Sequence, residues 1–439
     1  MKSKSFQQLE ENIKNKMVRV GVVGLGYVGL PLAIAFSEAG LKVLGFDIQQ
    51  ERVESINQGK SYIADVSSKR LATVSTNKLL EATADKSRLN ETDAICVCLP
   101  TPLSTTKMPD LSYIIHESEE IAKNPKVGQL IILESTTYPG TTKELVLPIL
   151  QRSGLKAGVD FYLAYSPERV NPGSKNYNIR NTPKVITGVD PESTKLTELL
   201  YGHIVDKIVL VSTPEVAEMS KIFENIFRNV NIALVNELAQ LCEKMGISVW
   251  EVIDAASSKP YGYMPFYPGP GTGGHCIPLD PHYLISRAME YDFHAKFVKL
   301  ATDINEQMPY YITSRIMDNL NIKGKSLKNT KVLVLGIAYK KDVADIRESP
   351  SLQVIQLLFE KGVEVSYNDP YIPEIQLHQD TLTSVEPTAE TLSSMDCVVI
   401  ATDHSCYDYQ HIADKANLVF DTRGATKGLI SGNVIRLGE

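Results

Sequence analysis

Cys276 is the residue whose surroundings in the sequence best suit a nucleophile. It ends the glycine-rich segment GGHC (273–276) and is followed by IPLDP (277–281) and the helical pattern HYLISRAMEY. We expect Asp280 to be the N-cap of this helix, which places the thiol near a helix N-terminus and favours its thiolate form. The neighbouring glycines leave room for a substrate. An isolated cysteine is usually a packing residue, but these neighbours favour a nucleophile.

A second pattern with chemical meaning lies near the N-terminus. Residues 24–29, GLGYVG, match G-x-G-x-x-G, follow the apolar run VRVGVV and open the helical pattern LPLAIAFSEAG. In a dinucleotide-binding turn the first glycine permits the tight bend, the second lets the pyrophosphate approach and the third lets helix and strand pack closely. Free N–H groups at the helix N-terminus would bind the phosphates. The predicted cofactor-binding residues of this turn are Gly24, Leu25, Gly26, Tyr27, Val28 and Gly29.

Asp47 indicates which dinucleotide is expected. It follows the apolar segment KVLGF (42–46), 18 residues beyond Gly29. A carboxylate there can accept hydrogen bonds from the ribose hydroxyls and would repel a 2′-phosphate, which predicts NAD. Arg52, five residues further on, is also counted as a cofactor-binding residue. An arginine can bind the 2′-phosphate of NADP, so Arg52 leaves NADP as the alternative cofactor.

A thiol nucleophile beside a nicotinamide predicts a particular reaction. Oxidation of an alcohol by hydride transfer needs a base but no covalent catalyst. A cysteine becomes useful when an aldehyde must be oxidised further, because the thiolate adds to the aldehyde, the adduct loses hydride and water cleaves the thioester. Each hydride requires a fresh NAD.

Lys221 and Asn225 can assist this chemistry. They are four residues apart in a long helical pattern that begins at Thr213-Pro214 and ends at Gly246, so they share one helix face. An ammonium and an amide can together stabilise alkoxide and tetrahedral intermediates. The spacing alone, however, fits an ordinary exposed lysine better.

The elements that must position these residues form an α/β pattern. Through about the first 200 residues, short apolar runs alternate with helical patterns, which predicts a parallel sheet, and a second such pattern begins at Lys331. The loop KPYGYMPFYPGPGTGGHC (259–276) has four prolines and five glycines, which exclude regular structure. We predict an α/β fold of two Rossmann-like doubly wound domains joined by a long central helix, with domains at 1–212, 213–318 and 319–439.

Composition excludes several classes of protein. The 439 residues carry a net charge of −7 and show no basic stripe, so no nucleic-acid partner is expected. No apolar run reaches the roughly 18 residues of a membrane span, so no membrane association is expected either. The polar N-terminus, MKSKSFQQLEENIKNKM, lacks the apolar core of a signal peptide. We expect it to be a solvated leader that can be helical.

The six cysteines indicate a reducing compartment. They are too few and too scattered for a disulfide framework, which predicts a cytoplasmic protein. Cys96 and Cys98 lie in an apolar run and would point to opposite faces of a strand, which is poor geometry for sharing a metal. We expect core cysteines there and no metal site.

Six separated blocks of this sequence resemble the UDP-glucose/GDP-mannose dehydrogenase family. They are VGLGYVGLP, ESTTYPGTT, YSPERVNPG, EMSKIFENIFRNVNIALVNELA, GPGTGGHCIPLDPHYL and GIAYKKDVADIRESPS. The resemblance covers nearly the full chain. It implies an NAD domain, a central helix and a nucleotide-sugar domain, in a homodimer or higher homo-oligomer formed through the central region. It also implies a four-electron oxidation of a nucleotide-sugar alcohol to a uronic acid.

The same resemblance implies roles for individual residues. Cys276 resembles the family nucleophile, and the other implied catalytic residues are Lys221, Asn225 and Asp280, which position water and stabilise oxyanions, and Glu168 and Thr136, which order a catalytic water. Further implied cofactor contacts are Thr101, Ser135, Thr136 and Arg347. The implied substrate contacts are Glu168, Arg169, Val170, Lys221, Asn225, Tyr267, Gly271, Gly273, Lys340 and Arg423.

Two departures from the animal UDP-glucose enzymes bear on the substrate. This chain has His275 where those enzymes carry serine, and Arg169 where they carry phenylalanine. These differences resemble bacterial and archaeal members that act on N-acetylhexosamine nucleotides, and the loop 259–278 most resembles UDP-N-acetylglucosamine 6-dehydrogenases of surface-polysaccharide pathways. Three alternative substrates stay open, namely UDP-N-acetylgalactosamine, UDP-N-acetylmannosamine and UDP-glucose. The position of one sugar substituent changes the binding free energy by only a few kcal/mol, so a few side chains can decide between them.

Two other classes of protein share parts of these patterns. Single-step hydroxyacid or sugar-acid dehydrogenases share the N-terminal fold and a lysine/asparagine helix, but they need neither Cys276 nor a second α/β domain. A non-catalytic nucleotide-binding protein would have no use for Cys276 together with Lys221, Asn225 and Asp280. The number of NADH formed per sugar separates the single-step class from a four-electron enzyme.

Overall fold

The computed structural model describes residues 3–63, 66–170, 176–377 and 380–439, so the last residues of the motif YSPERVNPG lie outside it. The chain forms two compact units. The first comprises Met1–Glu224 and His282–Asp292, and the second comprises Asn225–Pro281 and Phe293–Glu439. The boundary falls within α8 (Pro214–Met245), the long helix that the sequence predicts. The three-part division at 212 and 318 stays a prediction.

The first unit is built on an eight-stranded sheet. Its order is β3-β2-β1-β4-β5-β6-β7-β8, and its first six strands follow the order of a dinucleotide-binding fold. The strands are β1 (Arg19–Val23), β2 (Lys42–Phe46), β3 (Leu80–Thr83), β4 (Ala94–Val97), β5 (Gln129–Leu133), β6 (Phe161–Tyr165), β7 (Lys184–Gly188) and β8 (Ile208–Leu210). The expectation of a wholly parallel sheet is wrong at one place, because β7 runs antiparallel to β6. The residue types of a strand carry no sign of its direction, so the sequence could not show this.

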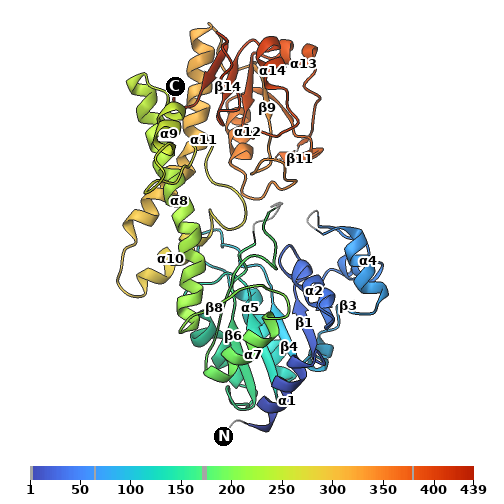
Figure 1. The fold of residues 1–439 in the computed structure, drawn as a ribbon. Coiled ribbons are helices and arrows are strands. Elements are labelled where there is room, and N and C mark those ends of the chain that lie inside the picture. The colour runs from blue at the N-terminus through green and yellow to red at the C-terminus, as the bar shows by residue number, and fades with distance from the viewer. Residues whose placement is uncertain (1–2, 64–65, 171–175, 378–379) are drawn as a thin grey trace. The chain divides into compact units, whose positions relative to one another are not determined.

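Helices cover both faces of this sheet, and most of its strand positions are buried (Figure 1). The helices are α1 (Lys4–Lys14), α2 (Gly29–Glu38), α3 (Gln50–Asn57), α4 (Ser68–Thr76), α5 (Ser112–Lys123), α6 (Leu147–Gln151) and α7 (Pro191–Tyr201), with a short 3₁₀ helix at Lys86–Glu91 and a short π helix at Thr141–Val146. Burial on both faces explains why these strands are continuous apolar runs rather than alternating ones.

The N-terminal segment is helical, but it is not a solvated leader. The Ser3 hydroxyl caps α1 by accepting a hydrogen bond from the Phe6 N–H, 3.1 Å away. Phe6, Leu9 and Ile13 are buried, and the Phe6 ring packs edge-on against Tyr162 with centroids 5.9 Å apart. These three side chains recur with helical spacing and form a narrow apolar stripe in a polar segment. The stripe anchors the helix to the core of the first unit.

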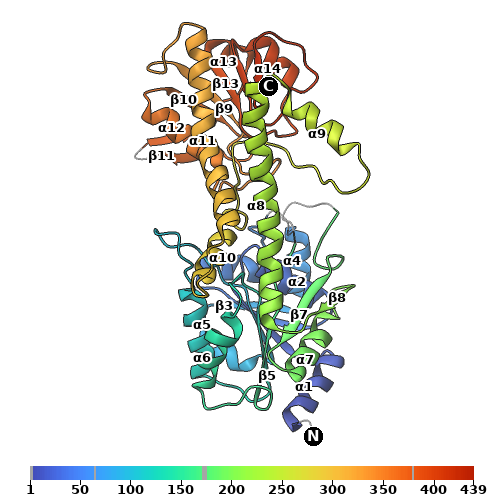
Figure 2. The same cartoon turned by 90° about the vertical axis from the view of Figure 1, so that its left-hand side faces the viewer.

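The second unit contains a smaller parallel sheet of order β10-β9-β13-β14-β15 (Figure 2). Its strands are β9 (Lys331–Leu335), β10 (Glu364–Asn368), β13 (Cys397–Ile400), β14 (Val419–Asp421) and β15 (Val434–Arg436), and a hairpin joins β11 (Glu374–Leu377) to β12 (Asp380–Thr383). The helices of this unit are α9 (Val249–Ser257), α11 (Lys296–Ile322), α12 (Pro350–Glu360), α13 (Ala389–Ser394) and α14 (Tyr409–Lys415). Helix α10 (Asp280–Met289) begins in this unit, and its residues from His282 onward belong to the first unit. The loop 259–276 contains neither helix nor strand, as its composition predicts.

Trp250 ties the end of the chain to this unit. Its ring N–H donates a hydrogen bond of 2.8 Å to the Leu437 carbonyl, and the neighbouring Val249 N–H donates one of 2.9 Å to the Gly438 carbonyl. The Trp250 ring also stacks on Tyr267, with centroids 6.0 Å apart. Helix α9 therefore holds both the C-terminus and one end of the loop that leads to Cys276.

Within the described residues, no helix is both long enough and apolar enough to cross a membrane. The same part of the chain holds no cluster of three or more histidine, cysteine or acidic side chains suited to a metal ion.

Candidate active site

The glycine-rich turn between β1 and α2 is shaped to hold a ligand. Gly24 adopts a φ of +87°, and its N–H donates a hydrogen bond of 2.8 Å to the Phe46 carbonyl. A Cβ atom on Gly29 would come within 1.9 Å of the Gly24 carbonyl oxygen, whereas a Cβ on Gly26 would meet nothing within 4 Å. The first and third glycines are thus required for packing, and the middle one borders open space at the start of α2. This arrangement fits a bound pyrophosphate.

Asp47 follows β2 and organises the same turn. One of its carboxylate oxygens accepts a hydrogen bond of 3.0 Å from the Leu25 N–H, and the other accepts one of 2.9 Å from the Gln49 N–H. Arg52 lies 3.4 Å from this carboxylate, so its charge is partly balanced within the protein. Tyr62, which sequence reasoning missed, donates its hydroxyl hydrogen to the Leu25 carbonyl at 2.6 Å. No motif pointed to it, because it lies 37 residues from Leu25.

Polar side chains join the carboxyl ends of β4 and β5. The Ser135 hydroxyl accepts from the Leu99 N–H at 3.0 Å and donates to the Leu99 carbonyl at 2.8 Å. The Thr101 hydroxyl donates to the Thr136 carbonyl at 2.9 Å. In a parallel sheet the carboxyl ends of neighbouring strands share one edge, so these residues lie on the same edge as the glycine-rich turn. The structure therefore brings the predicted residues Thr101, Ser135 and Thr136 together.

Glu168 lies in the segment after β6 and is held by several donors. One oxygen accepts hydrogen bonds from the N–H groups of Arg169 (2.8 Å) and Val170 (2.6 Å), and the other lies 3.3 Å from the Lys184 ammonium. Burial disfavours the charged carboxylate, but Lys184, the Val170 amide and Lys221 outweigh it and hold the pKa of Glu168 below its ordinary value. Glu168 is therefore ionised at neutral pH.

The Arg169 guanidinium contacts protein groups in this structure. It donates to the Pro183 carbonyl at 2.8 Å and to the Glu224 carboxylate at 2.5 Å. Glu224 belongs to α8, three residues after Lys221. Arg169 thus links the segment after β6 to the helix that carries Lys221, and its predicted contact with substrate stays a prediction.

In the second unit, Cys276 begins the turn that leads into α10. Its carbonyl accepts hydrogen bonds from the N–H groups of Leu279 (3.2 Å) and Asp280 (2.9 Å). Asp280 is the first residue of the helix and not the N-cap, so that expectation is wrong by one residue. The carboxylate of Asp280 contacts helix α8. It accepts a hydrogen bond of 2.5 Å from the Asn225 side-chain amide, and both residues are buried.

The glycines before Cys276 allow the loop to pack closely on a neighbouring segment. A Cβ on Gly274 would lie 2.9 Å from the Tyr339 ring, and a Cβ on Gly273 would lie 2.7 Å from the Tyr339 Cβ. Gly274 also has a φ of +85°, and its N–H donates to the Arg347 carbonyl at 3.0 Å. Tyr339 occupies the Cβ side of both glycines, and room for a substrate on their other side stays a prediction. Glycine is needed because the loop packs directly on the segment that follows β9.

Several predicted substrate residues gather around this loop. A Cβ on Gly271 would lie 2.8 Å from the Asn305 carbonyl oxygen, and Lys340 directly follows Tyr339 in the chain. The Arg423 guanidinium lies against Gly269, where a Cβ would come within 2.5 Å of one of its nitrogens. Arg347 is paired with Asp345, with a closest nitrogen–oxygen distance of 2.6 Å. Burial, with the charge of Arg347, lowers the pKa of His275, so an uncharged imidazole stands beside Cys276 at neutral pH.

The predicted catalytic set is divided between the two units. Thr136, Glu168 and Lys221 belong to the first unit, and Asn225, Cys276 and Asp280 belong to the second. Each group is organised internally, by the hydrogen bonds around Glu168 in one unit and by the bond between Asn225 and Asp280 in the other.

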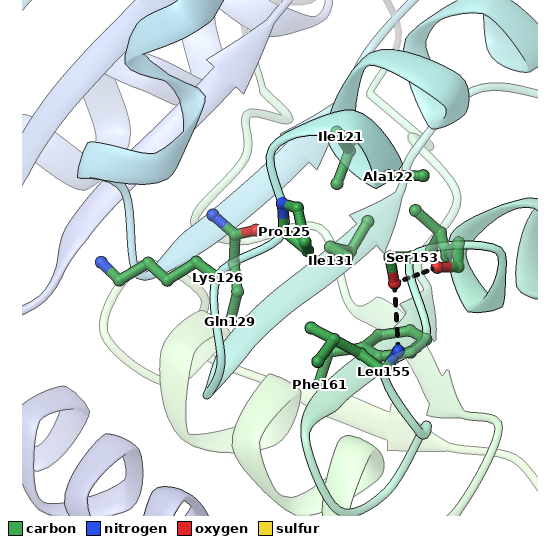
Figure 3. Close-up of a pocket in the computed structure, with 10 residues that line it drawn as sticks. Ile121, Ala122, Pro125, Lys126, Gln129, Ile131, Ser153, Leu155 and Phe161 are labelled. Atoms are coloured by element: carbon green, nitrogen blue, oxygen red, sulfur yellow. Dashed lines mark hydrogen bonds between the residues drawn. The ribbon is translucent and has the colours of Figure 1, made fainter.

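A separate hollow in the first unit lies at the opposite edge of its sheet. It is lined by residues from the ends of α5 and α6 and from the beginnings of β5 and β6 (Figure 3). Figure 3 shows Ser153 at its rim, where the hydroxyl accepts from the Leu155 N–H at 3.3 Å. The lining is mostly apolar, and the hollow adjoins the amino ends of the strands. Ligands of such sheets bind at the carboxyl ends, so this hollow is not the active site.

The chain is similar in sequence to known proteins. Profiles of the UDP-glucose/GDP-mannose dehydrogenase family match the chain over residues 18–205 (NAD binding domain), 215–307 (central domain) and 333–428 (UDP binding domain). A UDP-N-acetyl-D-glucosamine 6-dehydrogenase of Pseudomonas aeruginosa is 36% identical over 393 residues, which cover 89% of this chain and 91% of that protein.

Two solved structures are also similar to this chain. The UDP-D-ManNAc dehydrogenase from Pyrococcus horikoshii has a TM-score of 0.88 and 34% identity, covering 96% of this chain and 99% of that one. The NDP-N-acetyl-D-galactosaminuronic acid dehydrogenase from Methanosarcina mazei Go1 has a TM-score of 0.82 and 30% identity, covering 100% and 98%. The three relatives carry the names of three different N-acetylhexosamines.

Substitution of the glycines in the turn should separate ligand binding from folding. Gly26→Ala adds a Cβ into open space, so we expect an unchanged melting temperature but NAD binding weakened at least about tenfold, or about 1.4 kcal/mol. Gly29→Ala forces a clash with the Gly24 carbonyl and should lower the melting temperature as well. Calorimetric titration with NAD and thermal unfolding measure both effects. Full NAD affinity in Gly26→Ala would show that the pyrophosphate does not approach Gly26.

Asp47→Asn should reduce the preference for NAD over NADP. The substitution removes the charge that repels a 2′-phosphate, which at about 1 kcal/mol corresponds to an approximately fivefold fall in the ratio of the two dissociation constants. The ratio of the two dissociation constants is the proper measure, because Asp47→Asn also removes one acceptor for the N–H groups of the turn. That loss weakens the binding of NAD and of NADP alike. Arg52→Gln is the matched control and should not favour NADP. An unchanged ratio in Asp47→Asn would rule out this role.

Proposed function

Because the chain belongs to the UDP-glucose/GDP-mannose dehydrogenase family, we propose that it oxidises the C6 hydroxyl of UDP-N-acetyl-D-glucosamine to the uronic acid through a thioester on Cys276. The protein is an oxidoreductase with an NAD-binding domain and a UDP-binding domain. The observation that carries the proposal is the place of Cys276 at the turn into α10, next to the buried pair Asn225–Asp280.

The proposed reaction has three stages. NAD supplies the hydride acceptor in the first two. In the first, the C6 alcohol loses a proton and a hydride and becomes an aldehyde. In the second, the Cys276 sulfur adds to the aldehyde carbon, and loss of hydride and of the hydroxyl proton leaves a thioester. In the third, water attacks the thioester carbon, the carbon–sulfur bond breaks, and the carboxylate and the thiol are released. The sum is one alcohol, two NAD⁺ and one water giving one carboxylate, two NADH and three protons.

The residues of the second unit suit the addition of sulfur to carbon. Cys276 stands one turn before the amino end of α10, where the helix dipole favours a thiolate. The buried Asp280 carboxylate fixes the Asn225 amide through the 2.5 Å hydrogen bond. An amide oriented in this way can stabilise the oxyanion of the tetrahedral intermediate without reorganising during the reaction.

The residues of the first unit suit the proton transfers. Lys221 is a buried ammonium that can stabilise the C6 alkoxide as it loses its hydride. Glu168 is kept ionised by Lys184 and Lys221, so it can orient a water and accept its proton during thioester hydrolysis. Thr136 is held with Thr101 at the same sheet edge and is proposed as its partner for that water.

UDP-N-acetyl-D-glucosamine is the proposed substrate because of the loop 259–278 and of similarity to the Pseudomonas aeruginosa enzyme of that name. His275, partly buried and uncharged next to Cys276, is consistent with a pocket that accepts the N-acetyl group. The epimers UDP-N-acetylmannosamine and UDP-N-acetylgalactosamine and the parent UDP-glucose are the alternatives. We further propose that the product serves surface-polysaccharide synthesis. A cytoplasmic location is proposed because none of the six cysteines, all within the described residues, forms a disulfide.

NADH stoichiometry tests the reaction. We expect two NADH per sugar nucleotide consumed, measured at 340 nm across a panel of UDP-glucose, UDP-GlcNAc, UDP-GalNAc and UDP-ManNAc, with UDP-GlcNAc giving the highest kcat/KM. Cys276→Ser should abolish acid formation while NAD still binds. Cys242→Ser, a buried cysteine on α8, is the matched control. One NADH per sugar would favour a single-step dehydrogenase, and acid formation by Cys276→Ser would remove the thioester.

A second copy of this chain is the proposed partner of α8. In the second unit, this helix exposes large apolar side chains at helical spacing, and they are Phe227, Leu234, Leu238, Leu241 and Met245. An exposed apolar face of this extent is typical of a subunit interface. We expect the protein to sediment as a dimer or larger species and Leu238→Arg to shift it to a monomer. The control Ile430→Arg, at a fully exposed site elsewhere in this unit, should not change the sedimentation coefficient.

A further inference from the structure

We propose that Lys184 is a positioning residue of the hydrolytic step, because its ammonium is shared between Glu134 and Glu168 and fixes the Glu168 carboxylate for the water that cleaves the thioester. The inference rests on the function proposed above, since it concerns one stage of that reaction. It assigns a role to Lys184, which lies outside the six blocks, and to Glu134, which begins the block ESTTYPGTT but to which the resemblance gives no role.

The contacts of Lys184 account for all three of its ammonium hydrogens. Its nitrogen lies 2.5 Å from a Glu134 oxygen, 3.3 Å from a Glu168 oxygen and 3.2 Å from the Pro167 carbonyl oxygen. The side chains of Lys184, Glu134 and Glu168 are 6%, 0% and 16% exposed. A buried ammonium with three oxygen neighbours has no freedom to rotate away.

Glu134 is the fixed side of this arrangement. It directly follows β5, and its second oxygen accepts a hydrogen bond from the Tyr201 hydroxyl. The Lys184 ammonium also lies over the Tyr201 ring, 5.2 Å from its centroid. Burial raises the pKa of Glu134, and Lys184 opposes this effect. Lys184 is thus anchored to β5 and α7, and Glu168 is held against an anchored cation.

The geometry leaves one place on Glu168 for a water molecule. A carboxylate has about four acceptor positions, two on each oxygen. Among the described residues, the N–H groups of Arg169 and Val170 occupy one oxygen, and Lys184 contacts the other. The oxygen beside Lys184 therefore keeps one position for a water. That water can lose a proton to Glu168 as its oxygen attacks the thioester carbon, and the departing Cys276 thiolate then takes up a proton to regenerate the thiol.

The test combines Lys184→Met with Glu134→Gln. The double variant removes the cation without leaving an unpaired buried carboxylate at position 134, which would endanger folding. We expect a burst of two NADH per active site followed by turnover slowed on the order of 10- to 100-fold, with KM for the sugar nucleotide little changed. Intact-mass spectrometry of the quenched enzyme should show the acyl group on Cys276. A merely structural role would lower the active fraction but would not trap the acyl-enzyme.

Three companion variants make every outcome informative. Lys195→Met removes an exposed lysine of α7 and should behave as the wild type. Glu168→Gln should trap the acyl-enzyme by itself. If Glu168→Gln traps the acyl-enzyme but the double variant hydrolyses the thioester at the wild-type rate, the role of Lys184 is overturned and the proposed function still stands. If the wild type forms only one NADH per sugar, the proposed function fails first. Should the double variant not fold, Lys184→Gln decides, because its amide can still donate to Glu134 but carries no charge; slowed hydrolysis with an unchanged KM supports the role, and an unchanged rate overturns it.

Discussion

Both units depend on one constraint, which is that a carboxylate buried at the end of a strand must receive hydrogen bonds from the backbone of the neighbouring turn. Asp47 receives the Leu25 N–H in the first unit, and Asp369 receives the Ile337 and Ala338 N–H groups at 2.8 and 2.9 Å in the second. In each unit the turn begins with a glycine of positive φ, whose N–H donates at 2.8 Å to the last residue of the adjacent strand. An unpaired buried carboxylate would cost several kcal/mol, so this pairing fixes the turn.

The two units diverge directly after this shared beginning. In the first, the third glycine of the motif lets α2 start at once, with open space beside Gly26. In the second, a Cβ on Gly336 would come within 2.3 Å of the Thr402 carbonyl, and α12 begins only at Pro350. The intervening segment carries Tyr339, Lys340 and the backbone that receives Gly274. The same strand-end arrangement thus forms the cofactor-binding turn in the first unit. In the second unit it leads into the segment on which the cysteine loop packs.

The sequence was sufficient for features determined by local pattern. The glycine motif, the apolar strands and the 32-residue helix α8 all appear where spacing and composition predict them. Features determined by distant contacts could not be predicted in this way. The hydrogen bond between Asn225 and Asp280 joins residues 55 positions apart, and the space beside Gly274 is filled by Tyr339. Residue types indicate what chemistry is possible, but the neighbour that orients each group comes from another part of the chain.

The cluster around Lys184 shows why such neighbours matter. Replacing a buried ion pair with apolar residues is often neutral or stabilising, so burial of three charges is not explained by stability. The proposed role of Glu168 requires it to stay ionised although it is buried, and a nearby cation lowers its pKa. If Lys184 faced Glu168 alone, it would be drawn fully onto that carboxylate and compete with water for its oxygens. Glu134, at 2.5 Å compared with 3.3 Å for Glu168, attracts the ammonium more strongly and leaves the second carboxylate charged and accessible.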